Sequence, residues 1–190
     1  MRPLFGHHRV FQPRLQDGDG AVKQPMQTKI PGFVIRFAEE EDTALVLSFI
    51  KGLAAYEKLS HEVTATEDLL RETLFGSRQI AEVLIGEYRG DAVAFALFFH
   101  NYSTFLGQPG IYLEDLFVQP EMRGLGFGKV LLAYLAKVAT ERKCGRVEWA
   151  VLDWNEPAIR FYRKLGAATM DDWTVHRLTG EALNRLAAEF

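Results

Sequence analysis

The sequence predicts a mixed α/β fold in a single domain, and three observations lead to this prediction. Short apolar and β-branched runs typical of strands alternate with longer runs in which apolar residues recur at helical spacing. A glycine-rich segment over residues 118–129 joins the end of one such strand to the start of a helix. The chain has 190 residues, of which 48% are hydrophobic and 25% charged, which suits one globular domain with a sizeable core.

The first 32 residues differ from the rest of the chain. They contain four of the prolines, a polar stretch at residues 16–20 and little periodic pattern. They lack the apolar core of a secretory signal. We therefore expect residues 1–32 to be a disordered N-terminal extension, or the result of a start codon assigned too early, with Met26 as the true start; a functional arm is the alternative. A single folded domain is expected to occupy residues 33–190.

The first elements of this domain follow from local patterns. Residues 33–37 are apolar and β-branched, which predicts a strand, and residues 41–58 have the apolar spacing of an amphipathic helix. Thr64 precedes a glutamate by three residues, a capping-box pattern that predicts a second helix running to Phe75. Gly76 is a suitable stop for that helix.

The middle of the chain is rich in predicted strands. Residues 81–88 and 92–100 flank a tight hairpin turn at residues 89–91. Residues 108–110 read as another turn, and residues 111–118 as a third strand that is apolar on both faces apart from two adjacent carboxylates.

The last third of the chain returns to helices. Residues 123–142 carry an apolar stripe at helical spacing, and residues 147–152 form a buried strand. A further helix is predicted at residues 157–165 and a last strand at residues 173–178. Thr179 is a candidate cap for a terminal helix.

The most informative segment is the glycine turn. In V-Q-P-E-M-R-G-L-G-F-G-K, residues 118–129, a strand ends at a proline and three glycines then open a helix. Unpaired N–H groups and the helix dipole favour a diphosphate at such a helix start, and glycine lets the backbone approach phosphate oxygens closely. Arg123 and Lys129 could add positive charge at the same end.

Two familiar phosphate-binding patterns do not fit this segment. A Walker loop needs Ser or Thr after the lysine, but Val130 follows Lys129. A dinucleotide fingerprint that begins at Gly124 needs a third glycine at position 129. Arg-x-x-Gly-x-Gly remains, with a tight strand-to-helix turn that binds no ligand as the alternative.

On these residues the chain resembles the GNAT superfamily of acyl-CoA-dependent N-acyltransferases, over about residues 33–190. It looks closest to the spermidine/spermine (diamine) N-acetyltransferase group, although enzymes that acetylate thialysine or other amines share the same segments. The likeness is carried by Ala55-Tyr56-Glu57, by Tyr112-Leu113-Glu114-Asp115, and by Trp154-Asn155-Glu156-Pro157 with Phe161-Tyr162. It implies a mostly antiparallel central sheet flanked by helices, and a strand–glycine turn–helix site for coenzyme A.

The resemblance also implies which residues form the site. Acetyl-CoA would be bound by Leu116, Phe117, Val118, Arg123, Gly124, Leu125, Gly126, Phe127, Gly128, Lys129, Asn155, Ala158 and Tyr162, and the amine by Glu57, Glu114, Asp115 and Trp154. Glu57 and Asp115 could equally be solvated surface groups, Asn155 a plain helix cap, and Tyr162 a core aromatic.

The reaction requires a base. A primary amine has a pKa of ~10.4 and is mostly protonated at neutral pH, and lowering this pKa to the working range costs about 4 kcal/mol. By resemblance, Glu114 is expected to remove the amine proton through a water molecule, and Tyr162 to protonate the departing thiolate. The alternative for Glu114 is a pair with a buried arginine or lysine. Because Glu114 and Asp115 are adjacent in a strand, they should face opposite ways unless a bulge intervenes. Attack is expected to be direct, with no acyl-enzyme on Cys144.

Composition argues against several other classes of protein. A net charge of -3 and a pI near 6.0 argue against a general nucleic-acid binder, and no apolar run is long enough for a membrane span. The single cysteine favours a reducing compartment such as the cytoplasm. No His/Cys/Asp spacing indicates a metal site.

The leading hypothesis is acetyl transfer from acetyl-CoA to a polyamine or diamine. The resemblance implies a homodimer, in which the C-terminal segment could be exchanged or could share the acceptor site. The same reaction on an amino acid analogue such as thialysine, an aminoglycoside or a protein N-terminus is the alternative within enzymes. A non-catalytic acyl-CoA sensor is the alternative outside them, and the presence of both Glu114 and Tyr162 argues against it.

Overall fold

The computed structural model describes residues 24–190, and the chain divides into two compact units. The first ends at Trp149 and the second spans Ala150–Phe190. The expectation of one domain over residues 33–190 stays a prediction. Residues 1–23, the greater part of the predicted extension, lie outside the described residues.

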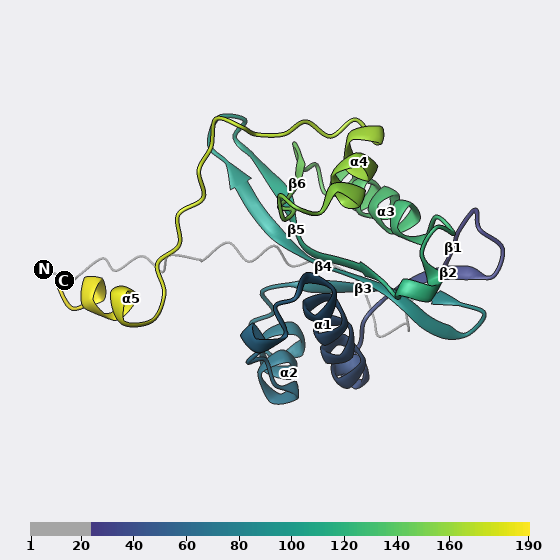
Figure 1. The fold of residues 1–190 in the computed structure, drawn as a ribbon, viewed down its shortest axis with the longest axis horizontal. Helices are drawn as coiled ribbons and strands as arrows, with labels where there is room; N and C mark the ends of the chain where they lie inside the picture. Colours follow the sequence, from purple (N-terminus) through teal and green to yellow (C-terminus); the bar gives the residue numbers. More distant parts are fainter. Residues whose placement is uncertain (1–23) are drawn as a thin grey trace, which may run out of the picture. The chain divides into compact units, whose positions relative to one another are not determined.

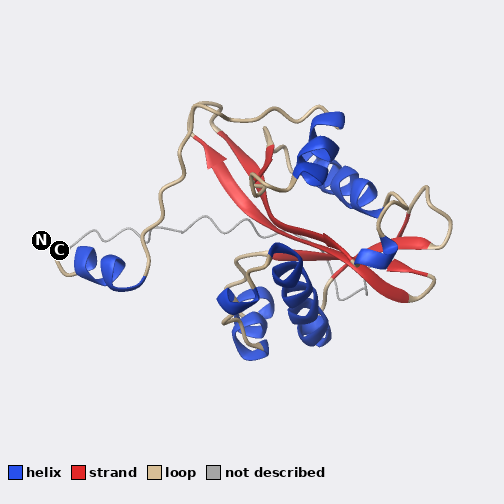
Figure 2. Cartoon of the chain, viewed as in Figure 1, coloured by secondary structure: helices blue, strands red, loops and turns tan. Residues whose placement is uncertain are grey.

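The first unit is built on a sheet of six strands within the described residues (Figures 1 and 2). The strands are β1 (Met26–Gln27), β2 (Phe33–Phe37), β3 (Glu82–Tyr88), β4 (Asp91–Ser103), β5 (Gln108–Val118) and β6 (Val147–Trp149). They lie in the order of the chain, and every neighbouring pair is antiparallel except β5 and β6, which are parallel. The expectation of a mostly antiparallel sheet is confirmed.

The sheet carries helices on both faces (Figure 1). Helices α1 (Thr43–Glu57) and α2 (Glu67–Phe75) cover one face, and α3 (Phe127–Glu141) lies on the other. The core under α1 and α2 includes Phe49, Phe95 and Phe117, and the rings of Phe49 and Phe95 stack 5.3 Å apart. Burial of such large aromatic rings is a main source of stability for this face.

The opposite face is held by aromatic packing on the start of α3. The rings of Phe33 in β2 and Phe127 in α3 stack with centroids 4.2 Å apart. Gly86 in β3 makes room for this pair, because a Cβ there would lie 2.7 Å from the Phe33 ring. The first residue of α3, which ends the glycine turn, is therefore fixed on the sheet.

The second unit contains α4 (Glu156–Lys164) and α5 (Gly180–Ala187). Residues 173–178, expected to be a strand, have no strand assignment, so this prediction is wrong for the structure. A strand exists only when a partner accepts its ladder hydrogen bonds, and within residues 24–190 this segment pairs with none. Thr179 precedes α5, but its side chain makes no capping hydrogen bond.

Several boundaries predicted from the sequence are also corrected. Thr66, not Thr64, caps α2, and its hydroxyl accepts from the N–H of Leu69. The hairpin turn between β4 and β5 precedes residues 108–110, which already belong to β5. Strand β6 ends at Trp149 and is only half-buried, because it pairs with β5 alone.

The first strand also begins earlier than residue 33. Met26 and Gln27 pair with Ile35 and Val34 of β2. The two strands are joined by a loop whose Thr28 hydroxyl donates to the Phe33 carbonyl at 2.7 Å and accepts from the Ile30 N–H. The last residues of the predicted extension are thus part of the first unit.

Candidate active site

The glycine turn presents a row of unbonded N–H groups. A short 3-10 turn (Pro120–Met122) follows β5, and α3 begins at Phe127 with Gly126 as its N-cap, four residues later than the predicted start of this helix. The first N–H that bonds back is that of Val130, which donates to Gly126. Within residues 24–190, no acceptor is bonded to the N–H groups from Gly124 to Lys129. The turn can therefore donate several hydrogen bonds to one anion.

Two glycines give the turn its shape. Gly124 has φ +80° and Gly126 has φ +90°, a region that other residues enter only with strain. No atom lies within 4 Å of a Cβ built on Gly124, so the space beside it is open. A Cβ on Gly126 would lie 3.4 Å from Ile30 of the β1–β2 loop, which forms one wall of the turn.

The side chain of Arg123 connects the turn to β5 and to α1. Its Nε donates to the carbonyl of Val118 at 3.0 Å, and its guanidinium carbon lies 4.2 Å from the ring centroid of Tyr56 in α1. The side chain is exposed, as is that of Lys129. Both positive charges remain available to an anion at the helix start.

The end of β5 has an open edge. Strand β6 pairs with β5 only at residues 111–113. The N–H of Gln119 donates to Val93 at the end of β4, and N–H directions alternate along a strand. The N–H groups of Leu116 and Val118 consequently point away from β4, toward the side that β6 leaves uncovered. Leu116 and Val118 are two of the residues predicted from the sequence to bind the coenzyme.

A β-bulge separates the two carboxylates of β5. Leu97 of β4 lies opposite Asp115, and Phe98 lies opposite Leu113, so Glu114 is the extra residue. Leu97 packs against the core under α1 and α2, which places Asp115 on that face. Glu114 is exposed, because the bulge turns it out of the ladder.

Asp115 is the carboxyl group with the most altered acidity. Burial, together with the charges of Glu114 and Glu57, raises the pKa of Asp115 to about 6. Burial also raises the pKa of Glu57, the last residue of α1. A carboxyl group with such a pKa is mostly ionised at neutral pH and basic enough to accept a proton.

The second unit carries the remaining predicted residues. The Asn155 side chain is buried and caps α4 by accepting from the N–H of Ala158 at 3.3 Å. Tyr162 is half-buried, with its ring 5.2 Å from that of Phe161, and Trp154 is half exposed. Capping by Asn155 is confirmed; contact of these residues with a coenzyme stays a prediction.

Taken together, the first unit fits coenzyme A. A pyrophosphate needs several convergent donors and a positive potential, which the N–H groups from Gly124 to Lys129 and the two exposed cations provide. An extended amide-containing chain needs a strand edge with free donors, and the segment from Leu116 to Val118 has them.

Comparison with known proteins decides the family. Residues 47–167 match the acetyltransferase (GNAT) family model. The chain is 40% identical to the thialysine N-epsilon-acetyltransferase of Bos taurus over 167 residues, covering 82% of this chain and 98% of that one. The L-ornithine N5-acetyltransferase of Arabidopsis thaliana is 34% identical, covering 80% of this chain and 86% of its own. This chain is a GNAT acetyltransferase. It acetylates amines and uses acetyl-CoA as co-substrate.

Solved structures support the fold of the acetyltransferase. An integron cassette protein from V. cholerae superposes with a TM-score of 0.70 at 24% identity, covering 82% of this chain and 98% of that one. At this identity the likeness concerns the fold alone.

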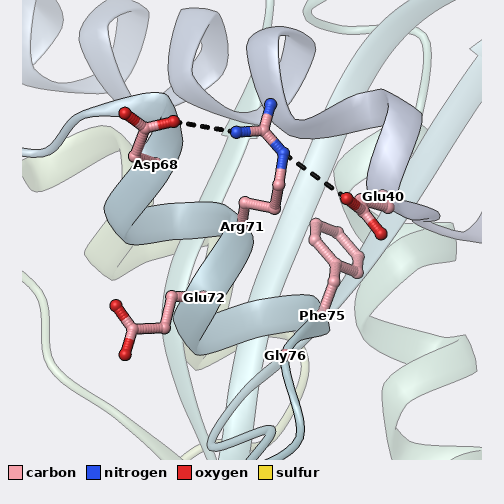
Figure 3. Close-up of a pocket in the computed structure, with 6 residues that line it drawn as sticks. All are labelled: Glu40, Asp68, Arg71, Glu72, Phe75 and Gly76. Carbon is pink, nitrogen blue, oxygen red and sulfur yellow. Dashed lines mark hydrogen bonds and ion pairs between the residues drawn. The ribbon is translucent and has the colours of Figure 1, made fainter.

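Within the described residues, a surface pocket of the acetyltransferase lies away from these groups. Figure 3 shows it between the start of α1 and α2, where Arg71 bridges Asp68 and Glu40. It is lined by Glu40, Asp68, Arg71, Glu72, Phe75 and Gly76, none of which was predicted for the site. Two of its three carboxylates, those of Glu40 and Asp68, already pair with Arg71.

No helix among residues 24–190 is long and apolar enough to cross a membrane. In the same part of the chain, no three His, Cys, Asp or Glu side chains form a group that could hold a metal ion.

The sequence interpretation missed two residues beside the turn. Ile30 lay in the segment expected to be disordered, and Tyr56 was noted only as part of a motif. Neither position carries a local signal for contact with residues about 70 or more positions away, because such contacts depend on how the sheet is assembled.

Proposed function

We propose that this acetyltransferase acetylates the terminal primary amine of a small aliphatic cation. The observation that carries the proposal is the group of carboxylates formed by Asp115, Glu57 and Glu114, in which burial and mutual repulsion raise the pKa of Asp115 to about 6. Three neighbouring carboxylates favour a cationic ligand. The strand that carries two of them leads directly into the phosphate-binding turn.

The side-chain amine of a basic amino acid is the first candidate acceptor. The similarity to a thialysine and to an ornithine acetyltransferase supports it. Diamines and polyamines are the second candidate, since a group of carboxylates can bind the second ammonium of such a molecule as well as the first. The segment from Tyr112 to Asp115, which resembles the diamine acetyltransferases, also favours this class.

In the proposed reaction, bound acetyl-CoA supplies an acyl group activated as a thioester. Asp115 accepts the proton of the attacking amine, directly or through water, while the exposed Glu114 binds and orients the cation. This exchanges the roles first expected for the two residues, because the bulge leaves Asp115 as the carboxyl with the more suitable pKa.

In the first unit, the N–H groups of Leu116 and Val118 and of the glycine turn bind acetyl-CoA. In the second unit, Asn155 and Ala158 are the proposed coenzyme-binding residues. Tyr162 donates a proton to the departing thiolate. On this proposal the acetyltransferase domain extends over residues 33–190, which agrees with a family match that includes residues of both units.

The test is release of free thiol from acetyl-CoA with a panel of amines: thialysine, ornithine, putrescine, spermidine and an aminoglycoside. The proposal expects kcat/KM at least tenfold higher for an aliphatic cation among the first four than for the aminoglycoside. Activity restricted to the aminoglycoside, or to a peptide N-terminus added as a further acceptor, would contradict it.

We also propose a cytoplasmic homodimer that uses the C-terminal segment. Trp173 and Val175 are 69% and 85% exposed in the second unit, and Leu183 and Leu186 of α5 are also exposed. A second copy of the chain would cover such side chains. Sedimentation of the wild type and of a Trp173→Asp/Val175→Asp variant tests this, with a shift from dimer to monomer expected; a monomeric wild type contradicts it.

A further inference from the structure

We propose that Tyr56, in the last turn of α1, is a positioning residue for the coenzyme site that acts through Arg123. The proposal rests on the proposed function, because it assigns coenzyme binding to the glycine turn. It adds a link between the end of α1, where Glu57 is proposed to help bind the acceptor amine, and the turn proposed to bind the coenzyme. A packing role for Tyr56 in the α1 core is the alternative that the test must exclude.

The contact between the two side chains is close and directional. The guanidinium carbon of Arg123 lies 4.2 Å from the centroid of the Tyr56 ring and 5.6 Å from that of Phe117. Its Nε donates to the Val118 carbonyl at 3.0 Å. Two aromatic faces and one carbonyl oxygen thus hold the cation, and each favours a positive charge.

The neutrality of these partners matters for the ligand. Within residues 24–190, no carboxylate forms an ion pair with Arg123. A carboxylate partner would neutralise the charge beside the turn, whereas a ring face fixes the guanidinium and leaves its charge uncompensated. The exposed cation then adds to the positive potential at the start of α3.

The position of Arg123 in the chain allows it to orient the N–H groups of the turn. It directly precedes Gly124, whose φ of +80° begins the row of free N–H groups. Its own N–H donates to Pro120 at 3.3 Å. With both its backbone and its side chain fixed, the directions of the following N–H groups are fixed before a ligand binds, which lowers the entropic cost of binding.

Close packing of α1 against β5 brings Tyr56 to this place. Gly52 lies one turn before Tyr56, and a Cβ on it would lie 3.1 Å from the Phe117 ring. The absence of a side chain at Gly52 lets Phe117 lie against the helix, so that the next turn of α1 reaches Arg123. A change in the ring at position 56 should therefore be transmitted to the turn by Arg123.

The experiment measures the Kd of coenzyme A by calorimetry without any amine, together with kcat and KM. Tyr56→Leu removes the ring face and is expected to raise the Kd of coenzyme A about 3- to 30-fold, the range of one cation–π contact. Tyr56→Phe keeps the face and should restore the Kd to within about twofold of wild type. The KM for acetyl-CoA should follow the Kd, with kcat nearly unchanged.

A double-mutant cycle identifies the route. In an Arg123→Met background, Tyr56→Leu should raise the Kd of coenzyme A no further, because its partner is already absent. Leu45→Ala, which removes packing from the same core far along α1, is the control and should lower the unfolding free energy without changing the Kd. If Tyr56→Leu does not fold, Tyr56→Met provides the same comparison with a side chain of larger volume.

The outcomes separate this inference from the proposed function. Equal Kd values for wild type and the leucine or methionine variant, or additive effects in the cycle, would overturn the role of Tyr56 alone. An equal loss in the phenylalanine and leucine variants would do the same, by assigning the effect to the hydroxyl group. A wild-type protein that does not bind coenzyme A would instead overturn the coenzyme site itself.

Discussion

Asp115 is half-buried on the face of the sheet covered by α1, whereas its neighbour Glu114 is exposed at the bulge of β5. The two carboxylates therefore have different environments although they are adjacent in sequence. The charge of Glu114 nevertheless acts on Asp115 and helps to raise its pKa to about 6. Two adjacent residues of β5 could therefore supply a base and a negative charge that binds the cationic amine. Two of the predictions below follow from this difference.

Asp115→Asn should change how stability depends on pH. The carboxyl group titrates near 3.8 in the unfolded chain and about 6 in the fold, so the native state binds more protons between these values. Its contribution to stability is full below about pH 4 and is lost as the pH rises through 6. The variant lacks this loss, so its unfolding free energy relative to wild type should rise by about 1–2 kcal/mol between pH 4 and pH 7.5. Urea unfolding at the two pH values measures the difference; a constant difference would contradict the raised pKa.

Glu114→Gln should move the acid limb of the activity profile. Removing a negative charge beside Asp115 lowers the pKa of that carboxyl, so the inflection of kcat/KM near pH 6 should shift to lower pH. The KM for a dicationic amine should rise about tenfold, the effect of one lost charge-assisted hydrogen bond. Asp115→Asn should instead remove the inflection and lower kcat. If Glu114→Gln removes it and Asp115→Asn does not, Glu114 is the base.

Gly126→Ala should weaken coenzyme binding more than it weakens the fold. An alanine at φ +90° costs about 1–2 kcal/mol, and its Cβ meets Ile30 at 3.4 Å. Displacement of the turn should raise the Kd of coenzyme A about 10- to 100-fold, as expected when a charge-assisted hydrogen bond is lost.

Gly107→Ala is the matched control for this variant. Gly107 also has a positive φ, +62°, and no atom lies within 4 Å of its Cβ position, but it lies in the turn between β4 and β5. The control should lose similar stability and keep its coenzyme affinity. Equal affinity losses in both variants would indicate a global effect of strain.

Tyr162→Phe should lower kcat about 100-fold, as expected for loss of a general acid, while the Kd of coenzyme A changes less than about threefold. Pre-steady-state thiol release and calorimetry measure the two quantities. Tyr102→Phe, at an exposed position in β4, loses the same hydroxyl type and should keep wild-type turnover. Parallel losses of turnover and affinity at Tyr162 would show that it packs against the coenzyme without donating a proton.

The elements nearest the site were the most predictable ones. The proline and glycines of residues 118–129 predicted the strand–turn–helix correctly, because a positive φ at Gly124 and Gly126 is a local requirement of the backbone. The cap of α4 by Asn155 was predictable for the same reason, since the bond spans three residues. The hairpin at Arg89 and Gly90 also follows local rules.

The sequence by itself determined the family and the strand–glycine turn–helix segment, since both follow from short-range patterns. Only the tertiary structure decided which carboxylate is buried, where Arg123 points and which segments fail to become strands. The bulge at Glu114 arises from the register between β4 and β5, and the contact of Arg123 with Tyr56 from the packing of α1 on the sheet. Both depend on contacts between segments far apart in the chain, and a short stretch of sequence does not determine the energy of such contacts.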